Sequence, residues 1–245
     1  MTAARCAPLR PLLRLLGLAL ALATATAHAD RPLFTEDAVI ADPGACVVEA
    51  WAKRGRGGAS EYWVMPACNP TGNFEITVGA MQLRAPGERD LRGILQGKTI
   101  FRALEPNGWG WGLVFGNEYG ATTQRPLRNR LIGDLYALVP VSWSVQDERW
   151  LVHANLGWMR EREERRDRAT YSLGTEYAVT PRIWAIGEMF GESGNGRPFY
   201  HVGVRYWIVP ERLQIDASYG NRFGRGTEDR FFTIGIAVFT DSILR

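Results

Sequence analysis

The residues of this chain best suited to chemistry are two histidines, two serines and a set of carboxylates that stand singly. His153 and His201 share one face of an alternating pattern with Ser172 and Ser218. A serine hydroxyl can attack an ester when it lies within hydrogen-bond reach of an imidazole that an Asp or Asn orients. Neither serine stands in the Gly-x-Ser-x-Gly turn of hydrolases, so catalysis is only weakly indicated.

Metal and cofactor chemistry has less support still. The sequence has no cysteine cluster, no His-x-x-x-His and no closely spaced Asp/Asn loop, which are the usual ligand patterns. The glycines of Gly108–Gly112 alternate with tryptophan and lack the Lys-Ser/Thr of a phosphate-binding loop. We therefore predict neither a metal nor a cofactor.

Strands must position these side chains, because the sequence around them alternates with a period of two. Apolar residues occupy every second position from Tyr200 to Ile208 and again from Leu213 to Tyr219. His201, Arg205 and Asp216 stand at the positions between them. Such alternation is typical of a β-hairpin with two unlike faces.

The same pattern continues along most of the chain. It predicts about twelve strands, with bounds uncertain by a few residues. They lie near 46–54, 61–69, 74–83, 94–104, 109–119, 131–145, 150–160, 169–179, 183–192, 199–209, 213–221 and 231–239.

The connections between these strands alternate in length, which indicates an up-and-down antiparallel sheet. Short turns fall at 69–73, 105–108, 146–149, 180–182 and 209–212. The longer, charged connections are residues 84–93, 120–130, 161–168 and 222–230. Successive connections lie at opposite ends of such a sheet, so one end has short turns and the other has longer loops. Bacterial outer-membrane barrels show this asymmetry.

The two faces of the strands favour a membrane barrel over a soluble sheet. One face is apolar, as in Trp150, Val152 and Leu156, and the other holds glycine, small residues and isolated charges. Only two lysines occur, which is few for a solvated face. The fold class is therefore all-β: an antiparallel up-and-down transmembrane β-barrel of about twelve strands, apolar outside and polar inside.

Aromatic residues add a second argument for this orientation. Several tryptophans and tyrosines fall near strand ends beside the short turns, where the membrane interface favours rings with one wet edge. They are Trp109, Trp143, Trp150, Tyr177, Trp184 and Tyr206. The alternative is a β-sandwich in which the same rings form an ordinary core.

Strand parity then assigns thirteen ionisable residues to the lumen. Confined charges are costly unless they are paired or wetted. The set is therefore either a salt-bridged polar interior that closes the barrel or the lining of a passage for a small solute. It comprises Glu49, Lys53, Glu75, Lys98, Arg102, Glu118, Asp134, His153, Glu176, Glu188, His201, Arg205 and Asp216.

The start of the chain predicts export. Three arginines precede a short apolar run that ends at Ala27-His28-Ala29, which is typical of a signal peptide over residues 1–29 with cleavage after Ala29. Residues 30–45 contain prolines and no periodicity, so we expect an extended segment that could enter the lumen. Residues 46–245 would form the barrel, located in the bacterial outer membrane.

Charge counts argue against a nucleic-acid partner. The signal peptide carries three of the 29 Lys+Arg and none of the 26 Asp+Glu, so the mature chain is formally neutral. Arginine is concentrated in the longer loops, and guanidinium groups pair well with phosphate. We expect contact with the phosphate-bearing glycolipid of the outer leaflet. The alternative is that these arginines only solvate the loops. They are Arg54, Arg56, Arg84, Arg89, Arg92, Arg125, Arg128, Arg130, residues 160–168, Arg222, Arg225 and Arg230.

Cys46 and Cys68 remain after the signal peptide is removed. In an exported protein an even pair of cysteines indicates a disulfide. If the first hairpin turns near Gly57-Gly58, pairs whose numbers sum to 114 lie opposite each other, so the two cysteines face across the strands. Two free thiols are the alternative.

Residues 31–80 resemble a known family. "RPLFTEDAVIADPGACVVEAW" and "YWVMPACNPTGNFEITVGA" are similar to the mature start of outer-membrane proteins grouped with the phenol-degradation meta-pathway transporters. The resemblance implies an outer-membrane barrel and suggests transport of hydrophobic or aromatic compounds. It assigns no catalytic residue.

The C-terminus departs from the usual pattern of such barrels, which end in an aromatic residue read by the barrel-assembly machinery. Here Phe239 is followed by six further residues, so either Phe239 closes the last strand or the signal is atypical.

Three functions follow. The first is passage or binding of a small, hydrophobic or aromatic solute, without catalysis. The second is a closed structural or envelope-maintenance barrel with a salt-bridged lumen. The third is a lipid-modifying enzyme, although strand parity places both histidines inside the barrel and away from lipid.

Overall fold

The computed structural model of the chain describes residues 31–122 and 132–244. The predicted signal peptide with its cleavage site lies outside the described residues, as do Arg125, Arg128 and Arg130. None of the helical structure within the described ranges is long and apolar enough to cross a bilayer.

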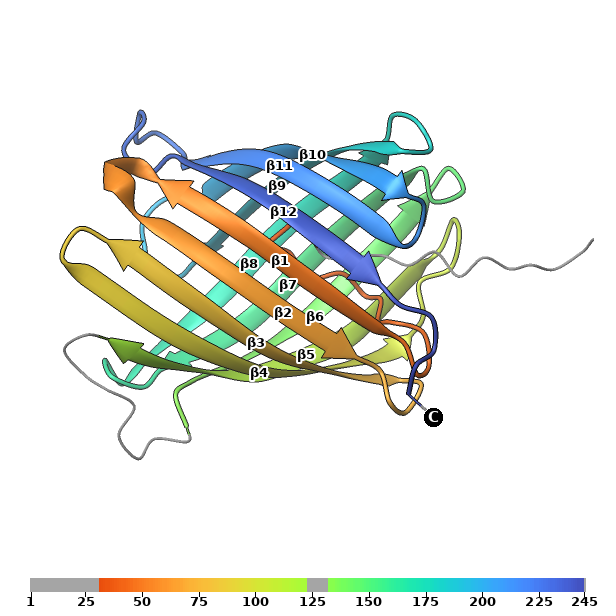
Figure 1. The fold of residues 1–245 in the computed structure, drawn as a ribbon, viewed down its shortest axis with the longest axis horizontal. Helices are drawn as coiled ribbons and strands as arrows, with labels where there is room; N and C mark the ends of the chain where they lie inside the picture. Colours follow the sequence, from red (N-terminus) through yellow and green to blue (C-terminus); the bar gives the residue numbers. More distant parts are fainter. Residues whose placement is uncertain (1–30, 123–131, 245) are drawn as a thin grey trace, which may run out of the picture.

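Twelve antiparallel strands form one closed barrel, in which each strand pairs with the next and the last pairs with the first (Figure 1). The predicted fold class and strand number are confirmed. The strands are β1 Cys46–Gly55, β2 Ser60–Cys68, β3 Phe74–Ala85, β4 Glu88–Arg102, β5 Trp109–Thr122, β6 Asp134–Val145, β7 Trp150–Glu161, β8 Arg166–Ala178, β9 Ile183–Glu192, β10 Phe199–Val209, β11 Leu213–Arg222 and β12 Phe231–Phe239.

The two ends of the barrel differ. The turns after β2, β4, β6, β8 and β10 lie at the end where the described chain reaches its C-terminus, on the right of Figure 1, and we call this the short-turn end. The connections after β1, β3, β7, β9 and β11 lie at the opposite end, the long-loop end, where β5 also ends. A short 3-10 turn, η2 Arg56–Gly58, belongs to the first of these connections.

Two connections at the long-loop end are shorter than predicted. The expected loop over 84–93 is wrong, because β3 and β4 extend through it to a two-residue turn at Pro86-Gly87. Gly87 has φ of +79°, which glycine adopts without strain. Charged residues occupy both faces of this stretch, so the alternation of apolar and polar positions that predicts a strand is not visible in the sequence. The turn between β7 and β8 likewise spans only residues 162–165.

The alternation of the strands separates an apolar exterior from a polar interior. Outward side chains are large and exposed, with Leu156 at 73% and Ile234 at 65%. Inward side chains such as Gln214 and His201 are completely buried. Because closure pairs the backbone of every strand, a barrel with this exterior can lie in hydrocarbon without unpaired peptide groups.

The first hairpin has the predicted register. Every Cα pair between β1 and β2 sums to 114, and Cys46 and Cys68 are opposite each other and joined by a disulfide. The bond ties β1 to β2 at the short-turn end. The last strand ends at Phe239, and the tail behind it returns to the start of β1 through the Thr240 amide, which donates to the Cys46 carbonyl.

Candidate functional site

The lumen is occupied by residues 31–42, which we call the plug. Arg31 and Asp37 are buried, and Thr35 and Ala38 are completely enclosed. The plug has no regular secondary structure, so its backbone groups need partners from the barrel wall. Its last part returns to the short-turn end, where the Asn69 side-chain amide donates to the Ala41 carbonyl at 2.6 Å.

Glu188 on β9 holds the middle of the plug. Its carboxylate accepts hydrogen bonds from the amides of Phe34 at 2.9 Å and Thr35 at 3.0 Å, and from the Thr35 hydroxyl at 2.7 Å. His201 Nδ1 lies 2.6 Å from the same carboxylate. One buried carboxylate therefore organises a turn of the plug, and an ionised group with several donors is well compensated.

Arg31 is held on the side of the lumen nearer the short-turn end. Its guanidinium donates to Asp216 Oδ1 at 2.8 Å, and both side chains are buried. Its carbonyl accepts from Arg205 Nε at 3.0 Å and from the Gln214 amide at 3.2 Å. Arg205 in turn forms an ion pair with Glu176. This layer of charges crosses the barrel from β8 to β11.

A third group of contacts fixes the acidic part of the plug. Lys98 Nζ lies 2.9 Å from Asp37 Oδ1 and 3.0 Å from Glu36 Oε2. Asn155 binds both backbone groups of Glu36, accepting from its amide and donating to its carbonyl, each at 2.8 Å. Two further plug amides donate to wall side chains, Ala38 to Ser142 and Ala41 to Glu75, each at 2.8 Å.

Small residues in the wall make room for the plug. A Cβ atom at Gly174 would lie 3.2 Å from Thr35 Cβ and 3.3 Å from Leu33 Cδ1. A Cβ atom at Gly235 would lie 2.8 Å from the Arg31 guanidinium. The inward face of the barrel therefore fits this segment in shape as well as in charge.

Both histidines take part in serine–histidine–carboxylate arrangements. His201 Nε2 lies 2.5 Å from Ser218 Oγ while its Nδ1 faces Glu188. His153 Nδ1 lies 2.7 Å from Ser142 Oγ, and its Nε2 is 3.8 Å from Glu176. The first set has the connectivity of a hydrolase triad. Sequence parity had suggested Ser172 as well, but that hydroxyl donates to Asn155.

The described state does not present these serines to a substrate. His153 and His201 are buried, and the Phe34 ring lies 5.3 Å from the His201 ring. Glu188 is shared with the plug. The geometry therefore supports a structural hydrogen-bond network, in which His201 binds a hydroxyl and a carboxylate and His153 binds the Ser142 hydroxyl.

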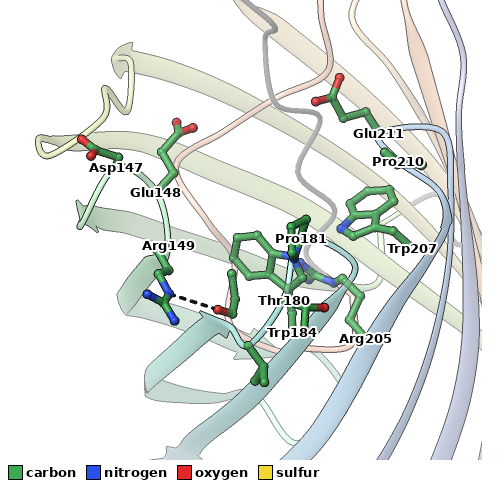
Figure 2. A pocket seen from close by; sticks show the side chains of 12 residues that line it. Asp147, Glu148, Arg149, Thr180, Pro181, Trp184, Arg205, Trp207, Pro210 and Glu211 are labelled. Atoms are coloured by element: carbon green, nitrogen blue, oxygen red, sulfur yellow. Dashed lines mark hydrogen bonds between the residues drawn. The ribbon is translucent and has the colours of Figure 1, made fainter.

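Two cavities lie on opposite sides of the plug. The first, of about 450 Å³, opens at the short-turn end, and we call it the mouth (Figure 2). Trp184, Trp207, Pro181 and Pro210 line it, with Arg205 at its inner side (Figure 2).

The second cavity, of about 330 Å³, lies toward the long-loop end, and we call it the vestibule. Phe34 of the plug, Phe190 and Phe199 line it together with Asn155, Ser172 and Arg197. The plug and its ion pairs therefore separate the mouth from the vestibule within one barrel.

Most of the predicted lumen set lies on the inward face. Glu49, Glu75, Lys98, Glu188, Arg205 and Asp216 contact the plug directly. Five more pair with other inward side chains: Lys53 with Glu61, Glu118 with Arg92, Glu176 with Arg205, His153 with Ser142, and His201 with Glu188. Asp134 lies at the rim, where it accepts from the Arg162 amide.

Arg102 is the exception, and its assignment to the lumen is wrong. A bulge between Ile100 and Arg102 shifts the pairing of β4 with β5 by one residue, so Arg102 pairs with Trp111 on the outward face. Its guanidinium lies 4.2 Å from the ring centroid of Trp109, which is also exposed.

Several residues that hold the plug were not among the predicted set. Gln96, Ser142, Asn155 and Gln214 share the inward parity, but they are uncharged and a selection of ionisable residues omits them. Among the described residues, no group of three His, Cys, Asp or Glu side chains could hold a metal ion.

Solved structures with the same fold include porins. A structure described as KdgM porin has a TM-score of 0.61 at 9% identity, covering 78% of this chain and 98% of that one. NanC porin has a TM-score of 0.54 at 9% identity, covering 79% and 98%. The outer membrane protein Omp33 of Acinetobacter baumannii has a TM-score of 0.50 at 8% identity, covering 79% and 96%. At these identities the likeness establishes the barrel fold.

Sequence comparison gives a different family from the one that residues 31–80 resemble. No curated protein matches the chain. One family pattern matches residues 17–240, nearly the whole sequence. The outer-membrane-type barrel implied by the earlier resemblance agrees with the fold, whereas membership of the phenol-degradation meta-pathway family is not supported. The chain belongs to the family described as "Uncharacterised conserved protein UCP029691".

Proposed function

We propose that the protein is an outer-membrane barrel that binds and passes a small solute, and that the plug closes its lumen in the described state. The observation that carries this proposal is the division of one polar lumen into a vestibule and a mouth by residues 31–42. The fold shared with porins and the apolar exterior support the membrane location and the export that this function requires.

The way in which the plug is held suits a removable barrier. Its contacts are mainly hydrogen bonds and ion pairs, such as those to Glu188, Asp216 and Lys98. Hydrogen bonds to charged groups such as these contribute about 1.5–3 kcal/mol each net, because water can replace the partner. A wetted lumen could therefore accept these groups at modest cost, whereas a densely packed apolar core would not open in this way.

Planar-bilayer conductance tests the proposal. The wild-type mature chain should show rare or no openings, and a variant lacking residues 31–42 should show frequent, stable ones. Gly174→Leu should have an intermediate effect, because its side chain would crowd Thr35 and Leu33 without shortening the chain.

Heat-modifiable migration on gels would first establish that each variant is folded. A folded deletion variant that never conducts, and through which vesicles take up no small solute, would contradict passage. It would favour the second function, a closed structural barrel. The buried pairs Arg31–Asp216 and Arg205–Glu176 are the specific observation behind that alternative.

The partners of such a barrel are the bilayer and, at its outer rim, phosphate-bearing glycolipid. A row across four strands supports the second partner: Arg54 is opposite Ser60, Ser60 opposite Arg84, and Arg84 opposite Arg89. These positions face outward, one step beyond the exposed Tyr62. Guanidinium groups pair well with phosphate, so an anionic headgroup could bind along this row. Arg92 points inward to Glu118 and takes no part.

A further inference from the structure

The geometry points to the vestibule as a binding site for a small aromatic anion of one or two rings. This inference rests on the proposed function and gives its solute a chemical class. The site lies on the long-loop side of the plug, and one of its walls is the plug residue Phe34.

The aromatic character comes from stacked rings that line this end of the lumen. Phe190 and Phe199 are stacked with centroids 5.4 Å apart and an interplanar angle of 12°. Phe34 lies 4.9 Å from Phe190, yet 38% of its surface is exposed. An exposed phenylalanine beside a cavity leaves apolar area that a flat ligand could cover.

The preference for an anion comes from the arginines at the same cavity. Arg222 is already engaged, because its guanidinium pairs with Asp229 and lies 4.3 Å from the Phe199 ring. Arg197 also lines the cavity, and within the described residues no carboxylate pairs with it. Glu192 lies 3.7 Å from Arg168, which also pairs with Glu161 at 2.8 Å, and its carboxylate accepts a hydrogen bond from the Asn195 side-chain amide. Arg197 is therefore the guanidinium available to a ligand at this cavity, and a guanidinium binds a carboxylate in two parallel hydrogen bonds.

Size and the remaining polar groups narrow the class further. A cavity of about 330 Å³ is near the lower limit of small-molecule sites, which suits one or two rings. Ser172 and Tyr136 line the wall at β6 and β8, and their hydroxyls already donate to Asn155 and Gln96. Their oxygens can still accept a hydrogen bond from a ring substituent.

Isothermal titration of the folded wild-type protein in detergent tests the inference. The probes are 2-naphthoate, the neutral 2-naphthylmethanol and the saturated decahydro-2-naphthoate. We expect saturable binding of 2-naphthoate and at least about tenfold weaker binding of the other two, since tenfold corresponds to roughly 1.4 kcal/mol. Each comparison removes one property, the charge or the flat ring.

Variants locate the binding. Arg197→Gln should weaken 2-naphthoate about tenfold while leaving 2-naphthylmethanol unchanged, and Phe199→Leu should weaken both. Arg212→Gln, at the opposite end of the barrel and paired with Asp241, serves as the matched control and should change neither. Absence of saturable 2-naphthoate binding, or equal binding by wild type and Arg197→Gln, would overturn the site.

The outcome is independent of passage. Binding that follows Arg197 and Phe199 in a protein whose plug-deleted form does not conduct would leave the ligand site intact and remove only the transport function. If the plug-deleted form conducts but the wild-type protein does not bind 2-naphthoate, the transport function stands and the ligand site is removed.

Discussion

At the residue scale, the lumen depends on charges whose partners are buried with them. Removing one member of such a pair costs more than the pair contributes, because the other charge is left in a site without water. The structure therefore makes different predictions for residues that the sequence alone treats alike.

Glu188→Gln should release the plug. A glutamine amide keeps the size of the side chain, but it offers one oxygen to donors that now use two, and its NH₂ meets the amides of Phe34 and Thr35. We expect a loss of unfolding free energy on the order of 3 kcal/mol and more frequent conductance openings. Urea unfolding in vesicles and single-channel recording measure these. Asp241→Asn, on the exposed tail, is the control, and an equal effect of both variants would refute a special role for Glu188.

Lys98 and Arg102 separate inward from outward positions on one strand. Lys98→Met should open the plug, because Glu36 and Asp37 would lose their buried cation. Arg102→Met should leave conductance unchanged, because its guanidinium lies over Trp109 on the exterior. Single-channel records of both variants give the comparison. A conductance change for Arg102→Met as large as that for Lys98→Met would place Arg102 in the lumen after all.

At the scale of elements, the barrel strands and the plug follow different physical rules. The strands are fixed by backbone ladders and by a closed register, whereas the plug is fixed only by side chains that meet its backbone. This difference explains how the barrel wall can stay rigid while the plug leaves the lumen.

The outward arginine row on β1 to β4 gives a prediction at this scale. The double variant Arg54→Gln/Arg84→Gln should retain less phosphate-bearing glycolipid after purification, because charge-assisted contacts to phosphate are lost. Mass spectrometry of co-purified lipid would measure the amount per barrel. Arg212→Gln, at the short-turn end and paired with Asp241, is the matched control. Equal retention by wild type and the double variant would mean that these arginines only solvate the rim.

At the scale of the whole molecule, the alternation of apolar and polar residues was enough to predict the barrel but not the plug inside it. The strands β9, β10 and β12 fall where the alternation predicts them, because every second side chain must meet lipid or lumen. Residues 31–42 have no period, and several of their partners, such as Glu188 and Asp216, come from strands more than a hundred residues away. Nothing local in the sequence encodes those contacts. The sequence did not predict the bulge before Arg102 for a related reason. One extra residue reverses which side chains of the strand face inward, and it does so without changing the composition.

The orientation of the strands underlies the lumen, the plug and the vestibule alike, and one pair of substitutions tests it. Leu156 lies near the middle of β7 with 73% of its surface exposed, so Leu156→Arg should reduce the stability of the bilayer-inserted barrel by about 2–4 kcal/mol. Leu156→Phe should be tolerated, because hydrocarbon accepts any apolar side chain there. Urea unfolding of the inserted protein gives both values. A protein that tolerated arginine at 156 as well as phenylalanine would have that face in water, and an apolar exterior would no longer account for the fold.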